Sequence, residues 1–147
     1  MFTEVTSEEG SPIPPTTEDF QKNLHFRVTL RRFLRWSEEQ AAEVGMTPAQ
    51  HQLLVAIKGH PGPRPPAVRE IADYLLLQSH SAVGLVDRAE AAGVVRRTPD
   101  PDDARVVRVE LTEKGDMLVT DLTTAHLAKL HELAAALNDR VNSDRQE

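Results

Sequence analysis

The chain of 147 residues contains no cysteine, and this absence excludes disulfides, thiolate metal ligands and a thiol-based oxidation sensor. It also lacks any apolar run approaching the roughly 18 residues that a membrane span requires. Its N-terminus does not show the basic-then-apolar order of a secretion signal. We therefore expect a cytoplasmic protein without a membrane partner. The 39% of hydrophobic residues is enough to fill one core, which predicts a single domain.

Patterns typical of catalysis are missing as well. No nucleophile stands at motif spacing from a base, and neither a phosphate-cradling glycine loop nor a paired-carboxylate motif occurs. His126 and His131 lie five residues apart, whereas a spacing of four would stack two metal ligands on one helical face. We predict neither an enzyme nor a protein that carries a metal or cofactor.

Positive charge is scarce, since 17 basic residues face 23 acidic ones for a net charge of −6. That balance at first argues against nucleic acid as a partner, because contacts to phosphates require Lys and Arg. Residues 61–111, however, hold seven arginines against eight acids, a balance of −1, so the flanks carry the remaining −5. Several acids of this middle segment lie at predicted turns and helix starts. The segment can therefore still present a cationic face.

Two long helices are predicted at the ends of the chain. Residues 1–16 are rich in proline and small polar residues, which is typical of a flexible tail. A helix is predicted over 17–44, capped by Thr16 or Thr17 and ended by Gly45, and a last helix over 112–141. Both carry more apolar residues than one small core requires, which predicts packing against a second copy of the chain. The apolar rows of the first helix are Phe20, Leu24 and Val28, and Phe26, Leu30, Phe33 and Leu34.

Between the long helices the pattern favours a helix-turn-helix followed by a hairpin. A short helix begins at Thr47-Pro48, a proline-rich loop follows it, and helices are predicted over 68–75 and 79–92. Short helix, tight turn and longer helix is a DNA-binding arrangement. Strands are predicted over 94–98 and 106–111, with residues 99–103 as a turn region. This order of elements is that of a winged DNA-binding domain.

From about Phe20 to Val141 the chain resembles the MarR family of bacterial winged-helix transcriptional regulators. Its most specific stretches are LVDRAEAAGVV at residues 85–95 and DARVVRVELTEKG at residues 103–115. The resemblance implies a mostly α fold with a small β-hairpin wing, in one domain over residues 17–147 with the winged helix-turn-helix lobe at 47–111. It also implies a homodimer held by the terminal helices. Such a dimer most often acts as a repressor on a pseudo-palindromic site in double-stranded DNA.

The resemblance also implies which residues contact DNA. The helix at 79–92 would be the recognition helix, and Arg105 would enter the minor groove. A salt bridge from Arg105 to Asp102 or Asp103 is the structural alternative for that arginine. Capping of the helix is the alternative for Ser79, and ion pairing the alternative for the other arginines. The candidate DNA-binding residues are Gln78, Ser79, His80, Ser81, Gly84, Arg88, Arg97, Asp103 and Arg105.

The chain departs from the family pattern at one of these residues and beside another. Family members often have a larger polar or basic residue where this chain has Gly84, and a second arginine where it has Ala104. Both changes reduce the reach toward DNA. A winged-helix protein-interaction module that kept the fold and dimer, with weak or no DNA binding, is therefore the alternative function.

A cationic strip on the first helix suggests a second kind of site. Arg27, Arg31 and Arg35 repeat every four residues, a pattern that is more often that of a solvated helix face. Related regulators bind phenolic or carboxylate compounds between the dimer helices and the DNA-binding lobe. The candidate effector-binding residues are Arg27, Arg31, Trp36 and His51, for a small organic anion or phenolic effector.

Overall fold

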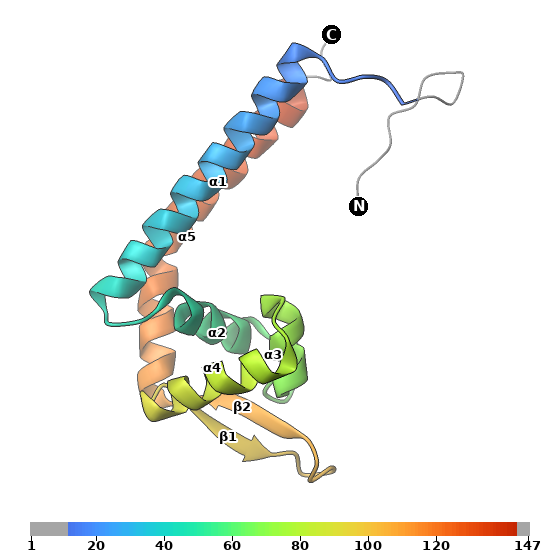
Figure 1. Cartoon of the computed structure of the whole chain (residues 1–147). Helices are drawn as coiled ribbons and strands as arrows, with labels where there is room; N and C mark the ends of the chain where they lie inside the picture. Colours follow the sequence, from blue (N-terminus) through green and yellow to red (C-terminus); the bar gives the residue numbers. More distant parts are fainter. Residues whose placement is uncertain (1–11, 144–147) are drawn as a thin grey trace.

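The computed structural model describes residues 12–143 and contains five helices and two strands within that range. In chain order they are α1 (Thr17–Glu43), α2 (Pro48–Gly59), α3 (Val68–Leu75), α4 (Ser79–Ala91), β1 (Val95–Pro99), β2 (Val107–Leu111) and α5 (Glu113–Ser143). Figure 1 shows α1 and α5 side by side as a long stalk, with the other elements gathered in a lobe at one end. The mostly α fold with a winged helix-turn-helix is confirmed. Residues 1–11 of the expected tail lie outside the described residues.

Local hydrogen bonds explain where α1 and α2 begin. Thr16 accepts a hydrogen bond from the Asp19 amide, and the Asp19 carboxylate accepts one from the Thr16 amide, at 3.2 and 2.7 Å. Thr47 and Gln50 form the same reciprocal pair at the start of α2. Each pair satisfies amides that the first turn of a helix leaves without partners. Gly45, at φ +77°, turns the chain out of α1 in a conformation that favours glycine.

The core of the lobe lies where α2, α3, α4 and the hairpin meet the start of α5. The hairpin is antiparallel, with Val95 opposite Leu111 and Arg97 opposite Val109. Because successive strand residues face opposite sides, Val95 and Val109 turn inward onto the helices. The side chains that are almost wholly buried there are Leu53, Leu54, Ile71, Val86, Val95, Val109 and Val119. This packing fixes α4 and the hairpin against one another.

One detail of the sequence prediction is wrong, and one alternative that it left open is not observed. Pro99 is not part of the turn but the last residue of β1, paired with Val107, because a strand end can accept a residue that donates no hydrogen bond. Ser79 does not cap α4: the capping position is held by Gln78, whose side chain makes no capping bond, and Ser79 is the first helical residue. Other boundaries differ from prediction by one or two residues, as helix ends commonly do.

None of the helices in the described part of the chain combines the length and apolar character needed to cross a membrane. Nor does that part bring three or more histidine or acidic side chains together where a metal ion could bind.

Candidate nucleic-acid interface

The N-terminal turn of α4 is exposed and presents the positive end of the helix dipole. Gln78, Ser79 and His80 are all exposed, and the first turn contains no acidic residue. Neither a side-chain cap nor a carboxylate therefore neutralises the amides and the helix dipole at this end. An arrangement of this kind binds a phosphate group readily. Ser81 is half-buried one residue further on, so its hydroxyl lies nearer the lobe.

Gly84 and Arg88 lie one turn apart on α4 and share a surface. A Cβ added to Gly84 would stand 3.3 Å from Nη1 of Arg88, and nothing else of the chain would lie within 4 Å. The arginine head therefore covers the space that the glycine leaves open. Arg88 is exposed and forms no ion pair within residues 12–143, so its charge remains available to a partner.

Arg97 is held by α4 and contributes little free charge. Its guanidinium contacts Asp87 at 2.5 Å and Glu90 at 3.0 Å, and its own amide donates to the second oxygen of Glu90. These contacts fasten β1 to the outer face of α4. The ion pairing weighed as the alternative for Arg97 is present, and its two acidic partners leave a net negative cluster there.

Asp100 organises the loop at the tip of the wing, which we define as β1, β2 and residues 100–106 between them. Its side chain is 4% exposed, and its carboxylate accepts hydrogen bonds from the amides of Asp102 and Asp103 at 2.8 and 3.0 Å. The guanidinium of Arg108 donates to the same carboxylate at 2.5 Å. That hydrogen bond, followed by the one from Asp102, lowers the pKa of Asp100 to about 2. The loop is therefore built around a permanent carboxylate.

Arg105 projects from this loop into solvent, with 91% of its side chain exposed. Nε lies 3.1 Å from one oxygen of Asp103, and a terminal nitrogen lies 3.1 Å from the other. The pairing lowers the pKa of Asp103 and orients the guanidinium, as the spacing of the two residues predicts. Because both groups are hydrated, the pair is easily exchanged for one with a phosphate or a base edge.

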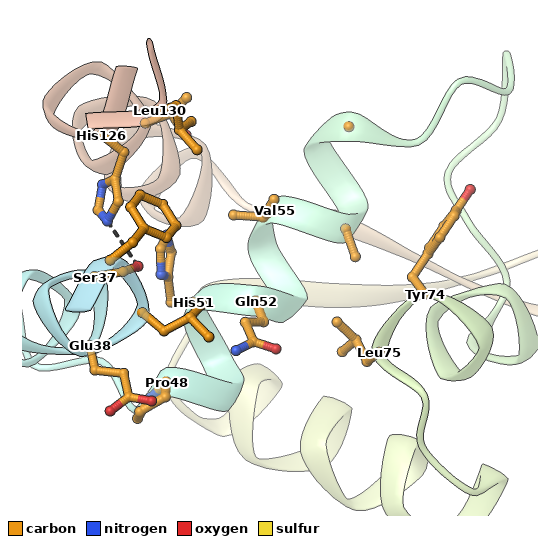
Figure 2. Close-up of a pocket in the computed structure, with 15 residues that line it drawn as sticks. Ser37, Glu38, Pro48, His51, Gln52, Val55, Tyr74, Leu75, His126 and Leu130 are labelled. Carbon is orange, nitrogen blue, oxygen red and sulfur yellow. Dashed lines mark hydrogen bonds between the residues drawn. The ribbon is translucent and has the colours of Figure 1, made fainter. Parts of the chain in front are cut away.

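A cavity of about 680 Å³ opens where the stalk meets the lobe, between α1, α2, α3 and α5. Figure 2 shows His51 of α2 near His126 of α5 at one end and Tyr74 of α3 at the other. Most of the wall is apolar, and no Lys or Arg takes part in it. The lining residues are Phe33, Leu34, Ser37, Glu38, Pro48, His51, Gln52, Val55, Ala56, Gly59, Tyr74, Leu75, Thr123, His126 and Leu130.

Two buried histidines give the cavity its polar end. Nδ1 of His126 donates to the carbonyl of Leu122, and Nε2 lies 2.9 Å from the hydroxyl oxygen of Ser37. The rings of His51 and His126 have their centroids 5.3 Å apart. Burial, and after it the neighbouring His126, lowers the pKa of His51, which is therefore neutral near pH 7. A neutral imidazole can accept a hydrogen bond from a ligand hydroxyl.

The structure does not bring the four candidate effector residues together. His51 lines the cavity. Trp36 lies beside His126, with ring centroids 4.6 Å apart and ring planes tilted by 59°, and lines a smaller groove of about 340 Å³ between α1 and α5. Arg27 and Arg31 line neither, and Arg27 instead donates to Asn23 one turn earlier on the exposed face. Arg32, from the same basic stretch, does reach the smaller groove.

Two functional candidates escaped the sequence analysis. Arg69, on the exposed face of α3, forms no ion pair within the described residues and lies in the same lobe as Arg88. The sequence shows that Arg69 is charged, but only the structure shows that no acidic side chain among the described residues pairs with it. For His126 the sequence argues only against a metal site shared with His131, and it is the approach of α5 to α1, which joins residues 89 positions apart, that shows the histidine to line a cavity.

An exposed helix N-terminus beside a wing with a projecting arginine defines a winged helix-turn-helix of the DNA-binding class. The MarR family profile matches residues 44–106, which include α2 to α4 and most of the wing. The transcriptional regulator MhqR of Bacillus subtilis is 32% identical over 123 residues, which cover 81% of this chain and 83% of that one. The repressor NicR of Pseudomonas putida is 30% identical over 116 residues, which cover 78% and 72%.

Solved structures share the fold at lower identity. AbsC, a MarR family transcriptional regulator from Streptomyces coelicolor, superposes with a TM-score of 0.71 at 20% identity over 90% of this chain and 91% of that one. A mutant of MepR from Staphylococcus aureus, bound to an oligodeoxyribonucleotide, gives 0.63 at 18% identity over 84% and 91%. The chain belongs to the MarR family of transcriptional regulators, and it is a DNA-binding regulator.

Proposed function

We propose that this regulator acts as a homodimer in which the two α4 helices enter successive major grooves of a pseudo-palindromic operator. The half-sites would lie about 10 bp apart, one turn of DNA. The observation that carries the proposal is the open N-terminal turn of α4, free of acidic residues and exposed beside the wing. Gln78, Ser79 and His80 would contact phosphates or base edges there, and Arg88 would approach the flank of the groove.

The wing would supply the second contact. Arg105 would exchange Asp103 for the minor groove, whose negative potential attracts an inserted arginine. Asp103 would act by holding the guanidinium ready, and Arg97 by fixing the hairpin to α4. The net charge of −6 limits nonspecific attraction to DNA. Binding would therefore depend on the proposed contacts from the N-terminal turn of α4, Arg88 and Arg105.

The exposed apolar rows of the terminal helices support the dimer. Phe20 and Leu24 on α1 are 61% and 62% exposed, and Met117 and Leu127 on α5 are 61% and 46% exposed. Apolar exposure on this scale, spread along two neighbouring helices, is typical of a surface that a partner covers. A second copy of the chain would cover it by the same rows.

Operator binding is tested by titrating the purified protein against labelled DNA from upstream of its own gene while the salt concentration is varied. We expect saturable binding to one site, in competition with an excess of unrelated DNA, and an affinity that falls as salt rises. Equal affinity for unrelated DNA, or no binding at low salt, would remove the proposal and favour a protein-interaction module.

The cavity supports a second part of the proposal: the protein is a repressor, and a small effector that binds in the cavity makes it release its operator. Its apolar wall, its lack of cations and the neutral His51 favour an uncharged aromatic ligand with one hydroxyl, that is a phenolic compound rather than a carboxylate. Burying a carboxylate there without a cationic partner would be costly. Arg27 and Arg31 would have no part in it.

Two matched probes separate these ligand classes. We expect 4-propylphenol to raise the unfolding temperature of the protein and 4-propylbenzoate to leave it unchanged. His51→Ala should reduce the phenol effect, whereas Arg31→Ala should preserve it. Stabilisation by the benzoate that is lost in Arg31→Ala would instead support an anion site on the basic strip.

A further inference from the structure

Tyr74 is both part of the cavity wall and the first member of a series of polar contacts that leads to the wing. Its ring lies at the opposite end of the cavity from the histidines, with its hydroxyl directed away from them (Figure 2). That hydroxyl lies 2.7 Å from Nδ1 of His60, which follows α2. The His60 side chain is only 9% exposed, so few waters can replace the tyrosine as its partner.

His60 also contacts Glu70 on α3. Its second ring nitrogen, Nε2, lies 3.6 Å from Oε2 of Glu70. A tyrosine hydroxyl that donates to Nδ1 leaves the ring proton on Nε2, where it faces the carboxylate. The other oxygen of Glu70 accepts the amide of Ala67 at 3.0 Å and so is fixed to the start of α3. Glu70 is therefore held between a histidine and its own helix.

Arg108 on β2 is shared by two carboxylates. One terminal nitrogen lies 3.7 Å from Glu70 and donates to the carbonyl of Pro65 at 2.8 Å, while Nε contacts Asp100. The guanidinium side chain is 20% exposed. Asp100 in turn holds the amides of the wing loop. Any change that draws Arg108 toward Glu70 weakens its hold on Asp100.

We infer that these residues form a switch that couples the cavity to the wing, and we call the series Tyr74, His60, Glu70, Arg108 and Asp100 the polar path. A ligand that packs against Tyr74 and turns its ring breaks the bond to His60. Glu70 then loses its oriented imidazole and attracts Arg108 more strongly. This weakens one of the two arginine contacts to Asp100, the other being that of Arg64, and loosens the loop that positions Arg105. The Tyr74 ring, bonded to His60 in this structure and turned from it when a ligand packs against it, would be the bistable element that such coupling needs.

This inference rests on the proposed function for its biological meaning, but its physical content is testable without DNA or ligand. Tyr74→Phe keeps the ring and removes the hydroxyl alone. We expect the amides of Asp102 and Asp103, which are bonded to Asp100, to exchange their hydrogens about fivefold faster in this variant, as the loss of one hydrogen bond would allow. Val55→Ala, which changes the same cavity wall away from the polar path, should leave that exchange unchanged.

The decisive measurement is made in a second background. Glu70→Gln retains an oxygen for the Ala67 amide and removes the charge that competes for Arg108, so Tyr74→Phe should no longer affect exchange in the wing when Glu70→Gln is present. Equal effects of Tyr74→Phe in both backgrounds, or none in either, would overturn the polar path. If the wild-type protein fails to bind any operator, the proposed function fails while the exchange result stands.

Discussion

At the tip of the wing the guanidinium of Arg105 donates two hydrogen bonds, each 3.1 Å long, to the carboxylate of Asp103. The two residues lie two positions apart in the chain. The arginine side chain is 91% exposed and the aspartate 39%. Water therefore screens the pair, which contributes little to the stability of the fold. Its value lies in holding the only cation of the loop in one orientation.

Arg105→Ala should weaken operator binding by roughly tenfold and reduce the dependence of affinity on salt by about one ion per subunit. The unfolding temperature should not change, because the lost pair is exposed. Fluorescence anisotropy at several salt concentrations measures both quantities. Arg35→Ala is the matched control, since it removes another highly exposed arginine, 83% against 91%, from an ion pair on α1. An equal loss of operator affinity in the two variants would mean that Arg105 contributes only its charge and makes no specific contact.

The wing loop also predicts how acid affects stability. The pKa of Asp100 is about 2 in the fold against 3.8 ordinarily, chiefly because Arg108 donates to it. A lowered pKa means that the ionised group stabilises the fold above about pH 4 and that this contribution is lost as the pH falls toward 2.

Asp100→Asn should consequently lower the unfolding temperature at pH 7, and the gap between variant and wild type should narrow between pH 4 and pH 2. Thermal unfolding followed by circular dichroism across that range measures the gap. A gap that stays constant with pH would show that the loop depends on the shape of Asp100 rather than its charge.

The fold was predictable from the sequence because its signals are local. Thr47-Pro48 starts a helix, Gly45 ends one, and the β-branched run at 106–109 favours a strand, so each element can be read from its own residues. The residues that we propose to face DNA follow from the position of α4 in that order. Their partners do not: the pairing of Arg97 with Asp87 joins a strand to a helix ten residues away.

The cavity was not predictable for the same reason. His51, His126 and Tyr74 come from three helices, and nothing in their spacing shows that they face one space. The basic strip of α1, by contrast, is conspicuous in the sequence, yet Arg27 and Arg31 line neither described cavity nor groove. The regular spacing of charged residues shows that they share one face of a helix, but the packing of the helices determines which residues or solvent that face contacts.

The apolar rows of α1 predict how the dimer can be broken. Leu24→Glu places a charge in a surface that we expect a second copy to bury, and should weaken dimerisation by roughly a hundredfold. Sedimentation velocity at several protein concentrations measures the change. Ala42→Glu adds the same charge at an exposed position at the other end of α1 and should leave the dimer intact. A Leu24→Glu protein that sediments as the wild type would exclude this row from the interface.

Leu76 predicts a gain in stability. It ends α3 with φ 54° and ψ 41°, a left-handed conformation that costs a residue with a Cβ about 1–2 kcal/mol, and its side chain is 91% exposed. Leu76→Gly should therefore raise the free energy of unfolding by about 1 kcal/mol, as glycine adopts this conformation without strain. Leu77→Gly, next in the chain but without a positive φ and only 37% exposed, should lower it. Urea unfolding distinguishes the two, and destabilisation by both variants would mean that the leucine side chain has a packing role.

Gly84 tests how closely α4 approaches DNA. In the protein alone Gly84→Ala meets only the flexible end of Arg88, so the helix should gain about 1 kcal/mol in stability. Gly115→Ala is the contrasting variant: its Cβ would lie 2.0 Å from the carbonyl oxygen of Val94, and the fold should be lost or severely weakened. If α4 lies in the major groove with Gly84 toward the DNA, the added methyl should reduce operator affinity severalfold even though the protein is more stable. A more stable variant with unchanged affinity would place the contact surface nearer the N-terminus of α4, on Gln78 to His80.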